Sequence, residues 1–205
     1  WMQKLPGGLI HVNVVGCALF AAISGSSAAT VATVGKMSIP ELRKRNYPEK
    51  ILLGSLAGSG TLGLLIPPSI ILIIYGVAVQ ESIAKLFIAG IIPGIMIALI
   101  FMSYVVIWSL INKKEMPQIL EEYSFFEKIK RSKQLLPVIL LITSVIGSIY
   151  TGVATATEAA SLGVVGALIL SYFQSSLTLE TFKSSLLGAT KTSCMIAFIL
   201  AGSTF

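Results

Sequence analysis

The stretch GTLGLLIPPS (60–69) lies inside an apolar segment over 51–79 that is long enough to cross a bilayer. Pro67 and Pro68 remove two backbone donors and clash with the preceding turn, so they interrupt a helix here, and Ser69 is placed to cap a second helix that begins after them. Three glycines loosen the turns before the prolines: Gly58, Gly60 and Gly63. We therefore predict a broken transmembrane helix over 51–79. The alternative, a proline kink in a passive helix, requires fewer helix-breaking residues than this stretch contains.

The composition points to a membrane protein. Of the 205 residues, 55% are hydrophobic and 12% are charged, whereas soluble domains carry about 25% charged residues. Such a chain cannot bury its apolar surface in a water-soluble core, so we expect an all-α polytopic membrane protein. The sequence begins with Trp1 and ends within an apolar run, and we expect 1–205 to be a fragment of one membrane domain.

Hydropathy and charge divide the rest of the chain. The expected elements are a transmembrane helix over 86–111, two transmembrane helices over 135–173 and a truncated helix over 186–205. The loops 36–50 and 112–133 are rich in Lys and Arg, which places both on the cytoplasmic side. The second has amphipathic spacing, so we expect a cytoplasmic amphipathic connector over 112–134.

The first apolar region does not behave as a simple span. Basic residues flank both of its ends, so both flanks read as cytoplasmic, and AISGSSAAT (22–30) divides its middle. We therefore predict a re-entrant hairpin over 7–38, with its polar tip inside the protein because irregular backbone at membrane depth must be covered. The alternative is one continuous helix that uses its small residues as a packing face.

The hairpin tip and the broken helix supply the predicted site. All nine acidic residues are Glu and lie mostly in predicted loops, which favours coupling to a cation through neutral oxygens rather than a buried proton relay. The predicted Na⁺ ligands are Ser24, Gly25, Gly60, Thr61, Gly63 and Pro67. The second hairpin arm begins near Ser27, and its N-terminal amides favour an anion. The predicted substrate-binding residues are Ser26, Ser27, Ala28 and Thr30.

Several separated motifs carry a family resemblance. They are GGLIHVNVVGCALFAAISGSSAATVATVG (7–35), IPEL (39–42), GSGTLGLLIPPSIILIIYG (58–76), KLFIAGIIPG (85–94) and TGVATATEAAS (151–161). Together they resemble the large membrane subunit of tripartite ATP-independent periplasmic (TRAP) transporters, although Ala156 stands where that family commonly has proline. The resemblance implies an inverted-repeat secondary transporter of the elevator type in the bacterial inner membrane. It also implies that this chain carries about the first of the two repeats and the segments after it.

The same resemblance implies the activity and the partners. The expected function is sodium-driven import of a carboxylate solute, of the C4-dicarboxylate or sialic-acid type. The expected partners are a periplasmic solute-binding protein, a small membrane subunit and the lipid bilayer, with no nucleic acid and no organic cofactor. The alternative is a stand-alone sodium-coupled carboxylate carrier without a binding protein. An intramembrane enzyme is disfavoured because one His and no Asp offer neither a nucleophile–base pair nor a metal cluster.

Overall fold

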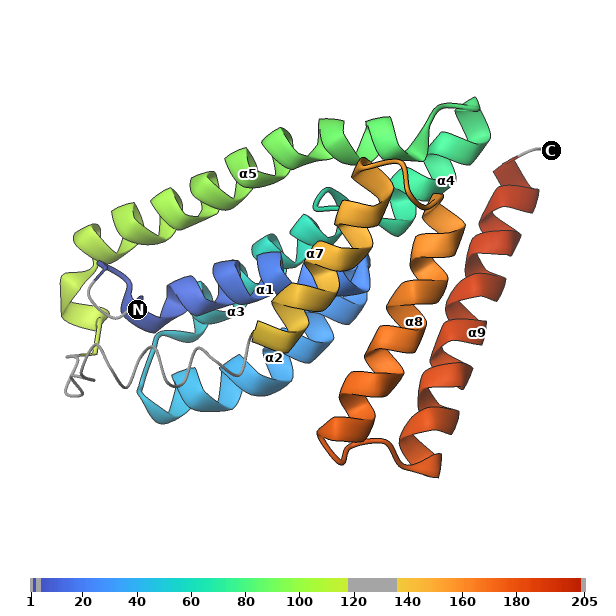
Figure 1. The fold of residues 1–205 in the computed structure, drawn as a ribbon. Helices are drawn as coiled ribbons and strands as arrows, with labels where there is room; N and C mark the ends of the chain where they lie inside the picture. Colours follow the sequence, from blue (N-terminus) through green and yellow to red (C-terminus); the bar gives the residue numbers. More distant parts are fainter. Residues whose placement is uncertain (1, 3–4, 118–135, 204–205) are drawn as a thin grey trace. The chain divides into compact units, whose positions relative to one another are not determined.

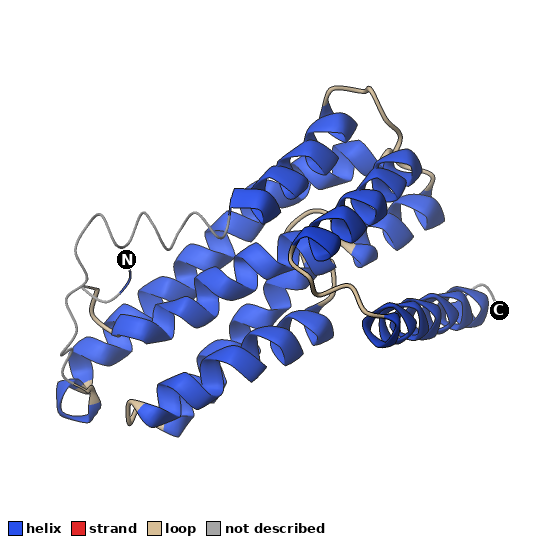
Figure 2. Cartoon of the chain, turned by 60° about the horizontal axis from the view of Figure 1, so that its bottom comes forward, coloured by secondary structure: helices blue, strands red, loops and turns tan. Residues whose placement is uncertain are grey.

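The computed structural model describes residue 2 and residues 5–117 and 136–203, and its regular elements in these ranges are all helices (Figure 2). The predicted α-helical class is therefore confirmed. The described chain forms two compact units, Trp1–Ala156 and Thr157–Phe205. Three of the described helices are long and apolar enough to cross a membrane: α5 (Ile83–Ile111), α8 (Ala156–Phe173) and α9 (Leu179–Ser203).

The first unit begins with a helical hairpin. A short 3-10 turn, η2 (Gly8–Ile10), leads into α1 (His11–Ser24), and α2 (Ser27–Lys44) returns beside it (Figure 1). Gly25 ends α1 in the left-handed region, with φ 58°, and its amide donates to the Ala21 carbonyl over 2.9 Å. Ser26 is extended and caps α2 by accepting the Ala29 amide on its hydroxyl, so two residues reverse the chain.

The second arm of the hairpin is longer than expected. The predicted end of the hairpin at residue 38 is too early, because α2 continues through Pro40 to Lys44. Hydropathy marks where the apolar run ends, but the helix stays amphipathic beyond it, and Leu42 is only 2% exposed. The helix ends before Asn46, which has φ 58°.

The predicted broken segment consists of two α-helices with irregular backbone between them. Helix α3 (Glu49–Gly60) passes into a 3-10 turn, η3 (Thr61–Leu64), and α4 (Ile70–Val79) follows after five residues without helical structure. Ser69 caps α4 by accepting the Leu72 amide, as the sequence predicted. Helix α5 then runs back along the first unit (Figure 1).

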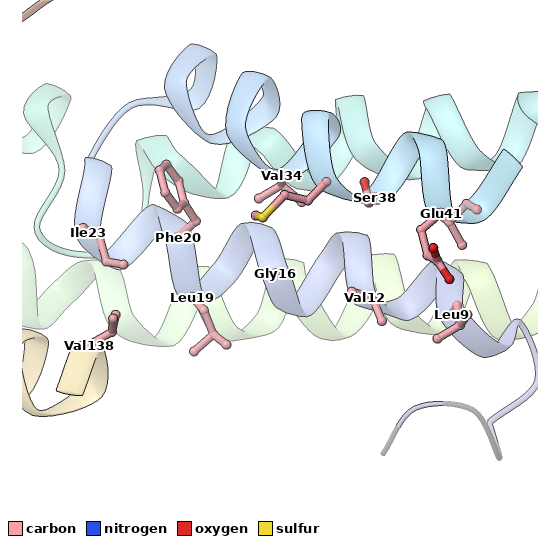
Figure 3. Close-up of a pocket in the computed structure, with 12 residues that line it drawn as sticks. Leu9, Val12, Gly16, Leu19, Phe20, Ile23, Val34, Ser38, Glu41 and Val138 are labelled. Carbon is pink, nitrogen blue, oxygen red and sulfur yellow. The ribbon is translucent and has the colours of Figure 1, made fainter. Parts of the chain in front are cut away.

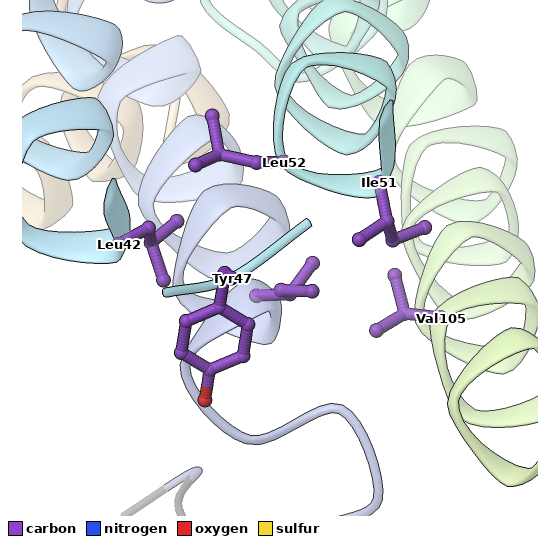
Figure 4. Close-up of a cluster of buried hydrophobic side chains, with 6 residues drawn as sticks. Leu42, Tyr47, Ile51, Leu52 and Val105 are labelled. Carbon is purple, nitrogen blue, oxygen red and sulfur yellow. The ribbon is translucent and has the colours of Figure 1, made fainter. Parts of the chain in front are cut away.

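A hydrophobic cluster fixes the open end of the hairpin, away from its turn. It joins η2, α2, the α2–α3 loop, α3 and α5 through Ile10, Leu42, Tyr47, Ile51, Leu52 and Val105 (Figure 4). Tyr47 adds a polar contact, since its hydroxyl accepts the Leu9 amide over 3.1 Å. The start of α1 and the end of α2 are thereby held against α3, which positions the turn at the other end of the hairpin.

The remaining helices differ from the sequence expectations mainly in their bounds. Helix α7 (Leu136–Tyr150) completes the first unit, and α8 and α9 form the second. The expected start of the last helix at 186 is wrong, because α9 begins at Leu179. The first turn of α9 contains Glu180 and precedes the apolar run, and Thr178 caps it by accepting the Thr181 amide over 3.1 Å. Most of the predicted connector over 112–134 lies outside the described residues, apart from a short 3-10 turn, η4 (Lys113–Glu115).

Candidate functional site

The turn of the hairpin lies directly against the interruption in the neighbouring helix. The Ile70 amide, at the start of α4, donates a hydrogen bond to the Gly25 carbonyl over 3.2 Å. A β-carbon at Gly25 would lie 2.6 Å from the Pro68 carbonyl oxygen, a distance that real β-carbons do not show. Only glycine fits here, because the position combines a left-handed φ with this close approach. We call residues 24–30 and 60–70 together the hairpin–break interface.

The 3-10 turn η3 makes a second close approach to the hairpin. A β-carbon at Gly63 would lie 2.8 Å from both the Ser26 carbonyl carbon and the Ser27 amide nitrogen. One at Gly60 would meet the Val31 side chain and lie 3.8 Å from the Ser27 carbonyl oxygen. The peptide groups of two segments far apart in the sequence are therefore in direct contact.

Two of the predicted site hydroxyls, those of Ser24 and Thr30, hold the hairpin turn together. Ser24 Oγ and Thr30 Oγ1 lie 2.9 Å apart, and Thr30 also donates to the Ser26 carbonyl over 2.7 Å. Thr30 is fully buried. Thr61 is exposed, and its hydroxyl donates to the Gly58 carbonyl over 2.7 Å within its own turn. A hydroxyl that donates its hydrogen keeps lone pairs for a cation, so these contacts leave the predicted coordination chemistry open.

Two helices begin at the hairpin–break interface. Ser26 caps α2 there, and the fully buried Ser69 caps α4 while donating its hydroxyl to the Leu64 carbonyl over 2.7 Å. Neither helix has an acidic residue in its first turn, so the partial positive charge of each N-terminus stays uncompensated by its own helix. Of the predicted substrate residues, Ala28 is exposed, whereas Ser26 and Ser27 are half-buried.

The predicted Na⁺ ligands thus do not all lie in the backbone contact. Gly25 and Gly63 belong to the backbone contact, and Gly60 lies against the Val31 side chain at its edge. The buried Pro67 lies near Gly90 of α5, and the hydroxyl residues Ser24 and Thr61 bond within their own turns. Among the described residues, no group of three or more His, Cys, Asp or Glu side chains could hold a metal ion. The chemistry available at the hairpin–break interface is therefore that of carbonyls, hydroxyls and backbone amides.

A buried polar bridge ties the first hairpin arm to the first half of the broken helix. The Asn13 side-chain amide on α1 donates to the Leu52 carbonyl over 3.1 Å and to the Ser55 hydroxyl over 2.9 Å, both on α3. Ser59 donates to the Ser55 carbonyl over 2.6 Å. These residues were not among the predicted site residues, although a lone Asn in an apolar helix is a signal of such a contact.

The hairpin also lines an apolar groove of about 540 Å³ (Figure 3). Its lining comes from α1, α2 and Val138 of α7, and includes Val12, Leu19, Val34, Ser38 and Glu41. The Ser38 hydroxyl is buried without a hydrogen-bond partner. Apolar walls with an acidic residue among them do not suit an anionic solute, so the hairpin–break interface is the better candidate site.

Residues 3–205 match the family model described as "Tripartite ATP-independent periplasmic transporter, DctM component". The chain belongs to the DctM family. The family predicted from the sequence is therefore confirmed, and it covers both units of the structure.

Curated DctM relatives are similar along nearly the whole chain. The "C4-dicarboxylate TRAP transporter large permease protein DctM" of Pseudomonas aeruginosa is 38% identical over 198 residues, covering 96% of this chain and 46% of the relative. The protein of the same name from Rhodobacter capsulatus is 36% identical, covering 95% and 47%. The "Sialic acid TRAP transporter large permease protein SiaM" of Vibrio cholerae is 36% identical, covering 98% and 46%.

The chain thus spans about half the length of the curated DctM relatives that it matches. These relatives are named as transporter permeases, and the apolar helices of this chain are those of a membrane protein. In this DctM chain, the hairpin turn and the broken helix meet through their backbones.

Proposed function

We propose that this DctM chain belongs to the large permease subunit of a sodium-driven importer of a carboxylate solute in the bacterial inner membrane. One observation carries the proposal: Gly63 of the broken helix lies against the backbone of Ser26 and Ser27 in the hairpin turn. In transporters, discontinuous helices at a repeat interface offer carbonyls to Na⁺ and helix N-termini to anionic substrate groups. The hairpin–break interface contains both kinds of group.

Na⁺ is proposed to bind where the two segments meet. Carbonyl oxygens of Gly60 and Gly63 would be its ligands, with Ser24 and Thr61 contributing hydroxyl oxygens. The absence of Asp from the sequence favours a site of neutral oxygens, and the described part of the chain holds no acidic cluster. The proposed Na⁺ site therefore uses the backbone for most of its coordination.

The carboxylate group of the solute is proposed to bind at the exposed N-terminal turn of α2. Ala28 is exposed there, and Ser26 and Ser27 are half-buried, whereas Thr30 is buried one turn into the helix. The nearby N-terminus of α4 adds positive potential of the same sign. Relatives named for C4-dicarboxylates and for sialic acid agree with a carboxylate solute, whereas a relative named for isethionate transports, by that name, a sulfonate.

A periplasmic solute-binding protein and a small membrane subunit are the proposed partners, and an elevator-type movement of the hairpin is the proposed transport step. The test is solute uptake by the reconstituted native-length permease with the proteins encoded beside it. Uptake that requires both a sodium gradient and the binding protein supports the proposal. Uptake without the binding protein favours the alternative, a stand-alone carrier, and sodium-independent uptake contradicts ion coupling.

The Na⁺ site has its own test. Ser24→Ala and Thr61→Val each remove one proposed hydroxyl ligand, whereas Ser144→Ala removes an exposed hydroxyl that bonds within α7. We expect the first two variants to require more sodium for half-maximal uptake and the third to behave as the unmodified protein. Unchanged sodium dependence in both site variants would remove their hydroxyls from the proposed site.

A further inference from the structure

Helix α5 approaches the broken helix through two glycines one turn apart. A β-carbon at Gly90 would lie 2.8 Å from the Leu65 carbonyl oxygen, and one at Gly94 would lie 3.1 Å from Cγ1 of Ile66. Both glycines are buried. Glycines at this spacing let two backbones approach closely in membrane proteins.

The segment between η3 and α4 therefore has backbone neighbours in two places. Pro68 lies against the hairpin turn at Gly25, whereas Leu65 lies against α5 at Gly90. The Leu65 carbonyl oxygen lies 2.8 Å from the place that a β-carbon on Gly90 would occupy, so this carbonyl and the α5 backbone are direct neighbours. The segment has few helical hydrogen bonds of its own to fix its course, so its neighbours determine where its carbonyls lie.

We propose that Gly90 of α5 is a positioning residue for the cation site, setting where the carbonyls of the broken helix lie against the hairpin turn. The inference rests on the proposed function, since it assumes that the carbonyls of Gly60 and Gly63, just before this segment, bind Na⁺. Gly90 itself acts only through the segment that it contacts at Leu65. This assigns α5 a part in ion binding in addition to spanning the membrane.

The two glycines provide a matched pair of variants. Gly90→Ala places a methyl group against a backbone carbonyl, which can move only if the chain around Leu65 shifts. Gly94→Ala places the same methyl group on the same helix 3.1 Å from Cγ1 of Ile66, a side-chain carbon, with the Ile66 backbone nitrogen farther away at 3.8 Å. Gly54→Ala is the open control, because no atom lies within 4 Å of its β-carbon position.

The measurement is the sodium dependence of uptake by the native-length permease in its assembled transporter, corrected for the amount of folded protein. For Gly90→Ala we expect the sodium concentration at half-maximal uptake to rise by about tenfold, within the range of couplings between linked sites. We expect little change in the maximal rate, and near-normal sodium dependence for Gly94→Ala and Gly54→Ala. Sodium-induced protection against thermal unfolding should weaken in parallel.

A second variant separates backbone positioning from ordinary packing. The β-carbon position of Gly90 also lies 3.1 Å from Cδ1 of Leu72, so Leu72→Ala relieves that side-chain contact but leaves the Leu65 carbonyl in place. We expect Gly90→Ala to stay defective in sodium dependence when combined with Leu72→Ala. Restoration of normal sodium dependence in the double variant, relative to Leu72→Ala alone, would show that packing dominates and would overturn the inference.

The failure of this inference is distinguishable from failure of the proposed function. Sodium-independent uptake by the unmodified transporter contradicts the proposed function before any variant is measured. If uptake does depend on sodium but Gly90→Ala and Gly54→Ala have the same half-maximal concentration, only the role of Gly90 is rejected. A folded Gly90→Ala protein that loses maximal rate at unchanged sodium affinity also rejects it.

Discussion

The Ile70 amide donates to the Gly25 carbonyl over 3.2 Å, so the first residue of α4 is hydrogen-bonded to the first residue of the hairpin turn. This bond joins two places where regular helical hydrogen bonding stops. Each leaves peptide groups without intrahelical partners, and such groups are costly at membrane depth unless another part of the protein satisfies them. The two interruptions therefore support each other, and changes at either one should disturb both.

Gly25→Ala should destabilise the protein by more than its left-handed backbone alone explains. A non-glycine residue in that conformation costs about 1–2 kcal/mol, and the new methyl group would also meet the Pro68 carbonyl oxygen. Gly152→Ala is the matched control, because Gly152 has φ 73° and open space at its β-carbon position. The measurement is thermal unfolding of the purified variants in detergent micelles. Equal losses of stability in Gly25→Ala and Gly152→Ala would show that the contact with Pro68 does not contribute to the effect.

Gly63→Ala should both destabilise the protein and weaken solute uptake. Its methyl group would meet backbone atoms of Ser26 and Ser27, and such overpacking typically costs about 1–3 kcal/mol. Gly54→Ala, in an open and exposed helical position, should leave uptake unchanged and raise stability slightly. Uptake and thermal unfolding are measured on the same preparations. Normal uptake by a stable Gly63→Ala protein would contradict the proposed closeness of hairpin and break.

Asn13→Ala should loosen the first hairpin arm from α3. The amide bonds of Asn13 to Leu52 and Ser55 are buried, and hydrogen bonds between membrane helices contribute about 0.6 kcal/mol on average and about 1.7 kcal/mol at most. A double-mutant cycle with Ser55→Ala should give a coupling energy of similar size, because the two side chains share a bond. Strictly additive losses in thermal stability would argue that the bridge has no energetic role.

Tyr47→Phe should lower stability by about 0.5–1.5 kcal/mol without affecting the site directly. The change removes the hydroxyl that accepts the Leu9 amide and leaves the ring in the hydrophobic cluster. Tyr104→Phe alters an exposed tyrosine on α5 and is the control. If the two variants unfold at the same temperature, the Leu9–Tyr47 bond does not stabilise the start of α1.

The features that the sequence predicted well have local causes. Pro67 and Pro68 act on the turn that contains them, and Ser69 caps the helix that begins at the next residue. The helical class follows from the apolar composition, because a chain that spans a membrane must satisfy its backbone hydrogen bonds internally, and helices do so within one segment. Family membership followed from motifs spread along the chain, and the match over residues 3–205 confirms it.

The features that the sequence did not reveal depend on contacts between distant residues. The spacing of Gly90 and Gly94 can be seen in the sequence, but it does not predict that Leu65 and Ile66 are their neighbours. The continuation of α2 to Lys44 was missed because hydropathy measures membrane affinity, whereas Leu42 is buried in a cluster with residues of η2, α3 and α5. The bridge from Asn13 to α3 likewise becomes visible only once the helices are packed.

The use of peptide groups at the hairpin–break interface has a consequence for how the site tolerates change. Where main chain meets main chain, as at Gly25 and Gly63, a replacement is admitted or refused according to its van der Waals volume, whatever its polarity. At Ser24 and Thr30, whose hydroxyls are hydrogen-bonded to each other, the activity of replacements should instead follow their capacity to donate and accept hydrogen bonds. In a library of all substitutions at these positions, function should therefore depend on side-chain volume at the glycines and on hydrogen-bonding capacity at the hydroxyl residues.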